Sequence, residues 1–278
     1  MDTANSSARR FQSAAPHYLA GRPPYSPQLI GGVATLCGLT RAHRVLDLGC
    51  GPAQLAVAFA PLVGEVVAID PEPAMLQAAA QNAERAGASL RLLECRAEDI
   101  SPTLGSFRVA VIGRAFHWMD RPHVLEKLNE QIEPEGAVVL FGSRHPHTSA
   151  NTWMREYRQL LERHAVDDGG QAQRRAPEWH SHEEVLLDSS FARLERVSVI
   201  ERRRTPIDTL IERAFSMSTT APGRLGARAE TLAQDVRALA VGHATGGNVT
   251  EIIETDALIA RRPSHPSHPS HPSHPSHP

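Results

Sequence analysis

Three features are scarce or missing in this chain of 278 residues. It has only three cysteines, Cys37, Cys50 and Cys95, which form no C-x-x-C pair, so we expect no disulfide framework and a reducing compartment. No apolar run approaches the roughly 18 residues that span a membrane, and no signal-peptide core stands near the start. We therefore predict a cytoplasmic protein with no membrane partner.

A strong charge of either sign is also missing. The formal net charge is −2 and the arginines are interspersed with acids, so no positive field attracts nucleic acid. Apolar residues make up 41% of the chain, which is enough for a buried core. These features favour a small-molecule substrate and no nucleic-acid partner, and they leave the oligomeric state open.

Apolar runs rich in valine, isoleucine and leucine alternate with helical stretches, which is typical of a parallel sheet covered on both faces. Strands are predicted at 43–48, 65–70, 89–94, 107–112, 137–141, 191–201 and 248–260. Helices are predicted at about 53–61, 73–86, 122–131, from 149 onward, 206–217 and 224–241. We expect an N-terminal helical lid (1–40), a core (41–142), an inserted cap (143–190) and two last strands with inserted helices (191–262).

Residues 263–278 repeat Pro-Ser-His and contain five of the fifteen histidines. In a polyproline II helix these imidazoles would share one face and could hold a metal ion. A disordered expression tag is the favoured interpretation of such low-complexity sequence. Elsewhere, the pair His180-x-His182 lacks a third ligand at metal-site spacing, so no metal is predicted.

The most informative segment joins an apolar strand to a glycine turn. Val45 to Leu48 lead into Gly49-Cys50-Gly51, and Asp70 ends the next apolar run. This arrangement brings bare backbone close to a nucleotide-type ligand, and the acid can bind ribose hydroxyls. A dinucleotide fingerprint would need a third glycine where the chain has Gln54, so a nicotinamide-dependent oxidoreductase is the least favoured alternative.

The string Asp47-x-Gly49-x-Gly51-x-Ala53 resembles the first motif of class I S-adenosylmethionine (SAM) dependent methyltransferases, whose third small residue is usually glycine. The stretch 114–118, Arg-Ala-Phe-His-Trp, resembles the segment after the fourth strand in small-molecule members. The Asn/Asp-Pro-Pro-aromatic stretch of methylases that act on amino groups of DNA bases or glutamine is missing there. The resemblance implies an α/β fold with a seven-stranded doubly wound sheet, order 3-2-1-4-5-7-6, strand 7 antiparallel, and a helical lid and cap inserted after strands 5 and 6.

The resemblance also implies the cofactor SAM, its product S-adenosylhomocysteine (SAH), and a set of binding residues. The cofactor-binding set is Tyr18, Arg22, Asp47, Gly49, Gly51, Asp70, Met75, Glu98, Asp99 and Ala115. In this set Tyr18 and Arg22 close over the SAM carboxylate, Asp70 binds ribose or caps the next helix, and Glu98 or Asp99 accepts the adenine amino group.

The substrate-binding candidates are Tyr25, His117, Trp118, His145 and His147. Further candidates from the inserted segments are Trp153, Trp179, His180, His182 and Met217. His117 is the one catalytic candidate, as a general base, a hydrogen-bond donor or a packed side chain. The predicted function is in-line methyl transfer to an O or N atom of a small molecule, such as a specialised metabolite. A catalytically silent SAM-binding regulatory protein is the main alternative.

Overall fold

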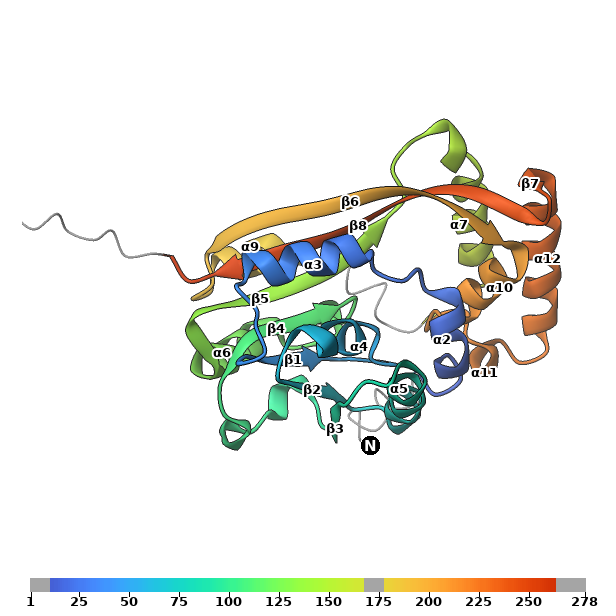
Figure 1. Ribbon diagram of the computed structural model, residues 1–278. Coiled ribbons are helices and arrows are strands. Elements are labelled where there is room, and N and C mark those ends of the chain that lie inside the picture. Colours follow the sequence, from blue (N-terminus) through green and yellow to red (C-terminus); the bar gives the residue numbers. More distant parts are fainter. Residues whose placement is uncertain (1–10, 168–177, 264–278) are drawn as a thin grey trace, which may run out of the picture.

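The computed structural model describes residues 11–167 and 178–263, in which one mixed sheet is flanked by helices (Figure 1). The strands are β1 (Arg44–Leu48), β2 (Glu65–Asp70), β3 (Arg91–Glu94), β4 (Phe107–Gly113), β5 (Ile132–Arg144), β6 (Arg193–Pro206), β7 (Ala244–Thr245) and β8 (Asn248–Arg261). Their order is β3-β2-β1-β4-β5-β8-β6, with β7 paired to β8. Strand β8 runs antiparallel to β5 and β6, so the predicted topology is confirmed, with β8 as the predicted seventh strand.

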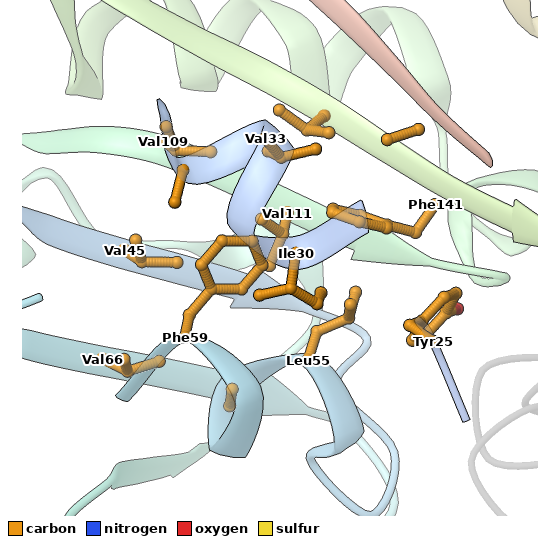
Figure 2. Packing of buried hydrophobic residues seen from close by; sticks show 14 of the residues in the cluster. Tyr25, Ile30, Val33, Val45, Leu55, Phe59, Val66, Val109, Val111 and Phe141 are labelled. Carbon is orange, nitrogen blue, oxygen red and sulfur yellow. The ribbon is translucent and has the colours of Figure 1, made fainter. Parts of the chain in front are cut away.

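Helices cover both faces of the parallel part of the sheet, as the two-sided burial of its strands requires. On one face lie α3 (Pro27–Leu36), α4 (Gln54–Phe59) and α5 (Pro73–Ala86). Figure 2 shows apolar side chains of α3 and α4 against the strands. Phe59 and Val111 are fully buried in this cluster. On the other face, α6 (Arg121–Gln131) and α9 (His182–Leu187) bury Leu128 and Leu186.

A group of helices from distant parts of the sequence lies beyond the ends of the parallel strands, and we call it the lid (Figure 1). The lid consists of α2 (Ala15–Gly21), α7 (Trp153–His164), α10 (Ile207–Phe215), α11 (Pro222–Leu225) and α12 (Arg228–His243). Tyr157, Leu210 and Val236 are buried together in its own core. Residues of the expected 143–190 cap therefore lie in two places, because α7 joins the lid whereas α9 covers the sheet.

The described residues also bear on the remaining expectations. All three cysteines are free thiols, and no helix in the described ranges is long and apolar enough to cross a membrane. No group of three metal-ligating side chains occurs among residues 11–167 and 178–263. The Pro-Ser-His repeat from residue 264 onward, the first ten residues of the expected lid and residues 168–177 of the expected cap lie outside the described part.

Candidate functional site

A cavity of about 620 Å³ lies where β1, β2, β4 and β5 end, under α2 and the loop after α10. This volume is within the range of small-molecule sites, and the carboxyl edge of an open α/β sheet is where such folds bind ligands. Ten of the predicted site residues line it: Tyr18, Arg22, Gly49, Gly51, Asp70, Met75, Glu98, Ala115, His117 and Trp118.

The glycine turn has the backbone geometry that its residues predict. Gly49 has φ +62° and Gly51 has φ +52°, both in the left-handed region that favours glycine. A side chain at Gly49 would place its Cβ 2.7 Å from the Cβ of Ala115, so contact with Ala115 alone excludes any residue larger than glycine at this position. Ala53, where the family usually has glycine, also lies in the left-handed region with φ +60°. The turn therefore keeps its expected shape at some cost in backbone strain.

Asp70 is the acid at the end of β2, and it faces the glycine turn. Its Oδ2 accepts a hydrogen bond from the Gly51 amide at 2.8 Å, and its Oδ1 accepts one from the Glu72 amide at 2.9 Å. Burial raises the pKa of Asp70, although these two amides lower it. The cap of α5 is Glu72 rather than Asp70. Each carboxylate oxygen can accept a further hydrogen bond, so Asp70 remains available to a ligand hydroxyl.

Asp47 lies behind the turn rather than in the cavity. It is 1% exposed, and its Oδ2 accepts a hydrogen bond from the Ala56 amide at 3.0 Å. Burial raises the pKa of Asp47 to about 7, and the nearby charge of Asp70 adds to this rise. This contact joins β1 to α4 behind the glycine turn.

The acidic turn after β3 supplies one side of the cavity. Glu98 lines it, with its carboxylate held by the Asp120 amide at 2.9 Å and by Arg96 at 3.3 Å. Asp99, the alternative acceptor of the adenine amino group, is not among the lining residues. Met75 is 3% exposed and lines the cavity on the side of Gly51. Of the two acids, Glu98 is therefore the one placed to meet a ligand.

Two imidazoles face the cavity beyond β4. The ring of His117 lies 4.8 Å from that of Trp118 and is stacked at 6.5 Å on that of His182, centroid to centroid. Arg121 lies 3.3 Å from Nδ1 of His182, and because arginine only donates, Nδ1 acts as the acceptor. Burial lowers the pKa of His182, and the charge of Arg121 lowers it further. Both effects favour the neutral ring, and a neutral ring that accepts at Nδ1 carries its proton on Nε2.

Two guanidiniums form the side of the cavity nearest the lid. Arg22 donates to the Ser216 carbonyl at 3.3 Å, and Arg114 donates to Oε1 of Gln54 at 2.7 Å. Arg114 has φ +58°, a left-handed conformation that is uncommon for a side chain of this size and that tends to cluster at functional sites. Arg114 belongs to the 114–118 stretch but has no role predicted from the sequence, although its position directly after β4 is a usable signal.

Three predicted substrate residues lie outside the cavity lining, which corrects their expected placement. Tyr25 is buried in the hydrophobic core, with its ring 5.4 Å from that of Phe141. Burial raises the pKa of Tyr25 to about 12. His145 binds Glu251, Nε2 to Oε2 at 2.8 Å, inside an ionic cluster. His147 is exposed. These histidines follow β5 as expected, but β5 continues to Arg144 and carries them past the cavity.

Glu251 on β8 connects the lid to the sheet. Both of its oxygens accept hydrogen bonds from Arg213 of α10 at 2.9 Å, and Thr205 at the end of β6 donates to it as well. Arg213 in turn donates to the carbonyl of Gly21 at the end of α2. Although burial opposes ionisation, Arg213 and His145 hold the pKa of Glu251 well below its ordinary value. The charge cluster thus fixes two lid helices above the cavity.

Two cavity residues next to the lid, Ser218 and Thr219, follow α10 and were marked by no local pattern. Met217, one of the further candidates, also lines the cavity, as does Phe11, which precedes α2. Phe11 packs its ring at 5.7 Å from that of Trp118, edge to face. Because these positions come from opposite ends of the chain, only the folded structure brings them together.

Comparison with known proteins finds similarity to methyltransferases. Residues 45–136 match the family model described as a methyltransferase domain. An uncharacterized methyltransferase of Mycobacterium tuberculosis is 29% identical over 153 residues, which cover 55% of this chain and 59% of that protein. A protein of Saccharomyces cerevisiae named "probable S-adenosylmethionine-dependent methyltransferase" is 28% identical over 136 residues, 48% of this chain and 46% of that protein. The chain thus spans about half the length of these relatives.

A solved structure supports the fold. The YcgJ protein of Bacillus subtilis superposes with a TM-score of 0.52 at 16% identity, covering 85% of this chain and 99% of that one. The glycine turn and the strands β2, β3 and β4 lie within the matched residues 45–136, whereas β6 and β8 lie beyond them. In its sheet order, in its glycine motif and over residues 45–136, the chain is similar to class I methyltransferases.

Proposed function

We propose that the cavity binds SAM and that the protein transfers its methyl group to an O or N atom of a small molecule. The observation that carries this proposal is the facing pair formed by the glycine turn and Asp70 at the ends of β1 and β2. The name of the yeast relative, which includes S-adenosylmethionine, supports the choice of cofactor.

The residues around the cavity fit the parts of SAM. Asp70 would accept hydrogen bonds from the ribose hydroxyls, and Glu98 would accept one from the adenine amino group. Met75 would cover a face of the adenine ring. At the other side, Arg22 beside Tyr18 would bind the SAM carboxylate, a planar anion that suits a guanidinium.

When bound, SAM would supply an electrophilic methyl group for in-line displacement from its sulfur, which would keep the electron pair, to the acceptor atom. The chain's main task is to align the acceptor, because orientation can contribute roughly 7–11 kcal/mol whereas a general base adds about 3–5 kcal/mol. His117 would take the proton of a hydroxyl or ammonium acceptor. His182, neutral and protonated on Nε2, would donate a hydrogen bond to the acceptor's oxygen.

A small acceptor is favoured by the cover over the site. The lid and the loop after α10 lie over the cavity, and Glu251 fixes α10 and α2 through Arg213. A cavity of about 620 Å³ also favours catalysis over a silent SAM-binding role, because it has lining residues on the acceptor side, among them His117 and His182.

Isothermal titration with SAH and SAM tests the cofactor. We expect binding by the wild type and an affinity lowered about 10- to 150-fold by Asp70→Ala, the range for losing hydrogen bonds to a charged group. Asp188→Asn is the matched control, because Asp188 is exposed at the end of α9 and away from the cavity lining. Absence of SAH binding by the wild type contradicts the proposal, and tight binding of NADH in the same assay would favour an oxidoreductase.

A further inference from the structure

We propose that the acceptor carries a carboxylate and that Arg114 is the residue that binds it. This inference rests on the proposed function, since it concerns the second ligand of the same cavity. It starts from the two guanidiniums that line the cavity on the lid side, Arg22 and Arg114.

Both guanidiniums lie against the ring of Tyr18. The Cζ atom of Arg22 is 5.4 Å from the centroid of the Tyr18 ring, and the Cζ atom of Arg114 is 5.9 Å from the same centroid. Burial lowers the pKa of Arg22, and the positive charge of Arg114 contributes to this effect. The cavity therefore brings two like charges against one aromatic ring, an arrangement that an anion between or beside them would stabilise.

Neither guanidinium has a carboxylate partner within residues 11–167 and 178–263. The protein groups that accept their hydrogen bonds are neutral: the Ser216 carbonyl for Arg22, and Gln54 and the Pro23 carbonyl for Arg114. The Nε atoms of both are buried without a hydrogen-bond partner in the described structure. Arg213, the neighbouring buried arginine, differs in this respect because Glu251 neutralises it in a two-point ion pair.

The cavity is consequently polarised. Its acidic side chains, Asp70, Glu72 and Glu98, lie at the end of β2 and after β2 and β3, where Arg96 is paired with Glu98. The unneutralised arginines, Arg22 and Arg114, lie after α2 and after β4. Since β1 separates β2 from β4 in the sheet, the two charges occupy opposite sides of the glycine turn. A ligand set with hydroxyl and amino donors at one side and carboxylates at the other matches this distribution.

The cavity has two unneutralised arginines, whereas SAM has only one carboxylate, so one arginine is left for the acceptor. SAM has one carboxylate, and Arg22, on the lid and beside Tyr18, suffices to bind it. That leaves Arg114, whose backbone lies directly before Ala115 and His117 on the acceptor side. Arg114 is also held rigidly, by Gln54 and by the Tyr25 ring at 4.6 Å from its Cζ atom, as a residue that positions a substrate should be.

The test measures anion binding by the SAH complex, with malonate as the probe and malonamide as its uncharged analogue. We expect malonate, but not malonamide, to raise the melting temperature of the SAH-saturated protein in a concentration-dependent manner. Arg114→Met should weaken malonate binding about 10- to 150-fold while leaving the SAH affinity unchanged. Arg22→Met should instead lower the SAH affinity.

Two variants separate charge from folding. Arg114→Lys keeps the positive charge and should retain part of the malonate effect. Arg203→Met is the matched control, because Arg203 also donates to a backbone carbonyl, that of Pro24, but does not line the cavity. It should leave the malonate effect intact.

The outcomes are separable. The anion site is overturned if SAH binds but malonate has no effect. It is also overturned if malonate has an equal effect on the wild type and on Arg114→Met. Neither outcome contradicts the proposed function. A loss of SAH affinity in Arg114→Met as large as that in Arg22→Met also overturns the anion site, since both arginines would then serve the cofactor. Failure of SAH to bind the wild type counts instead against the proposed function.

Discussion

Replacement of Asp47 by asparagine should flatten the dependence of stability on pH. Asp47 is fully buried, and burial raises its pKa from 3.8 to about 7. Between these two values the unfolded chain binds fewer protons than the folded one, so the free energy of unfolding falls as pH rises. A difference of about 3 pKa units corresponds to about 4 kcal/mol, present below pH 4 and lost by pH 7. An asparagine retains the oxygen that accepts from the Ala56 amide and does not ionise.

Urea unfolding of the ligand-free protein, followed by tryptophan fluorescence at pH 4 to 8, measures this effect. The stability of Asp47→Asn minus that of the wild type should increase by about 4 kcal/mol across this range and stay level above it. Any fixed cost of burying the extra amide hydrogens shifts the difference equally at every pH. Asp188→Asn, at an exposed position, should follow the wild-type curve. Parallel curves for Asp47→Asn and wild type would refute the burial argument.

Three further changes test the turn, the lid and the chemistry. Gly49→Ala should lower the free energy of unfolding by about 2–5 kcal/mol in urea, because a left-handed alanine and a contact of 2.7 Å with Ala115 are both unfavourable. Gly242→Ala is the control, because Gly242 has open space around it, and it should not destabilise the protein. Glu251→Gln should lower the free energy of unfolding by about 3–5 kcal/mol, since it leaves a buried guanidinium without its counter-ion; a loss below 1 kcal/mol would contradict this. His117→Ala should lower kcat by about 10²–10⁴-fold and abolish a pH dependence while SAH affinity persists, and unchanged kcat from pH 6 to 9 would exclude a base.

Features with local causes were predictable from the sequence. The helix predicted at 73–86 coincides with α5, because a proline starts it and Gly87, with φ +60°, ends it. The strand predicted at 137–141 is longer in the structure, and β5 runs to Arg144. Its extension depends on pairing Gly142 with Asp256 and Arg144 with Glu254, partners more than a hundred residues away. No local pattern contains that information.

The same distinction explains which site residues could be found. The glycine turn and Asp70 belong to one strand–turn–helix unit and the strand that follows it, so their spacing suffices to predict them. An arginine's charge, by contrast, is informative only once its partners are known. Arg213 and Arg114 have the same side chain, but β8 brings Glu251 to the first and the fold brings only neutral groups to the second. The proposed acceptor site therefore depends on the lack of a carboxylate partner for Arg114 among the described residues. That lack can be recognised only from the three-dimensional arrangement of the lid over β4.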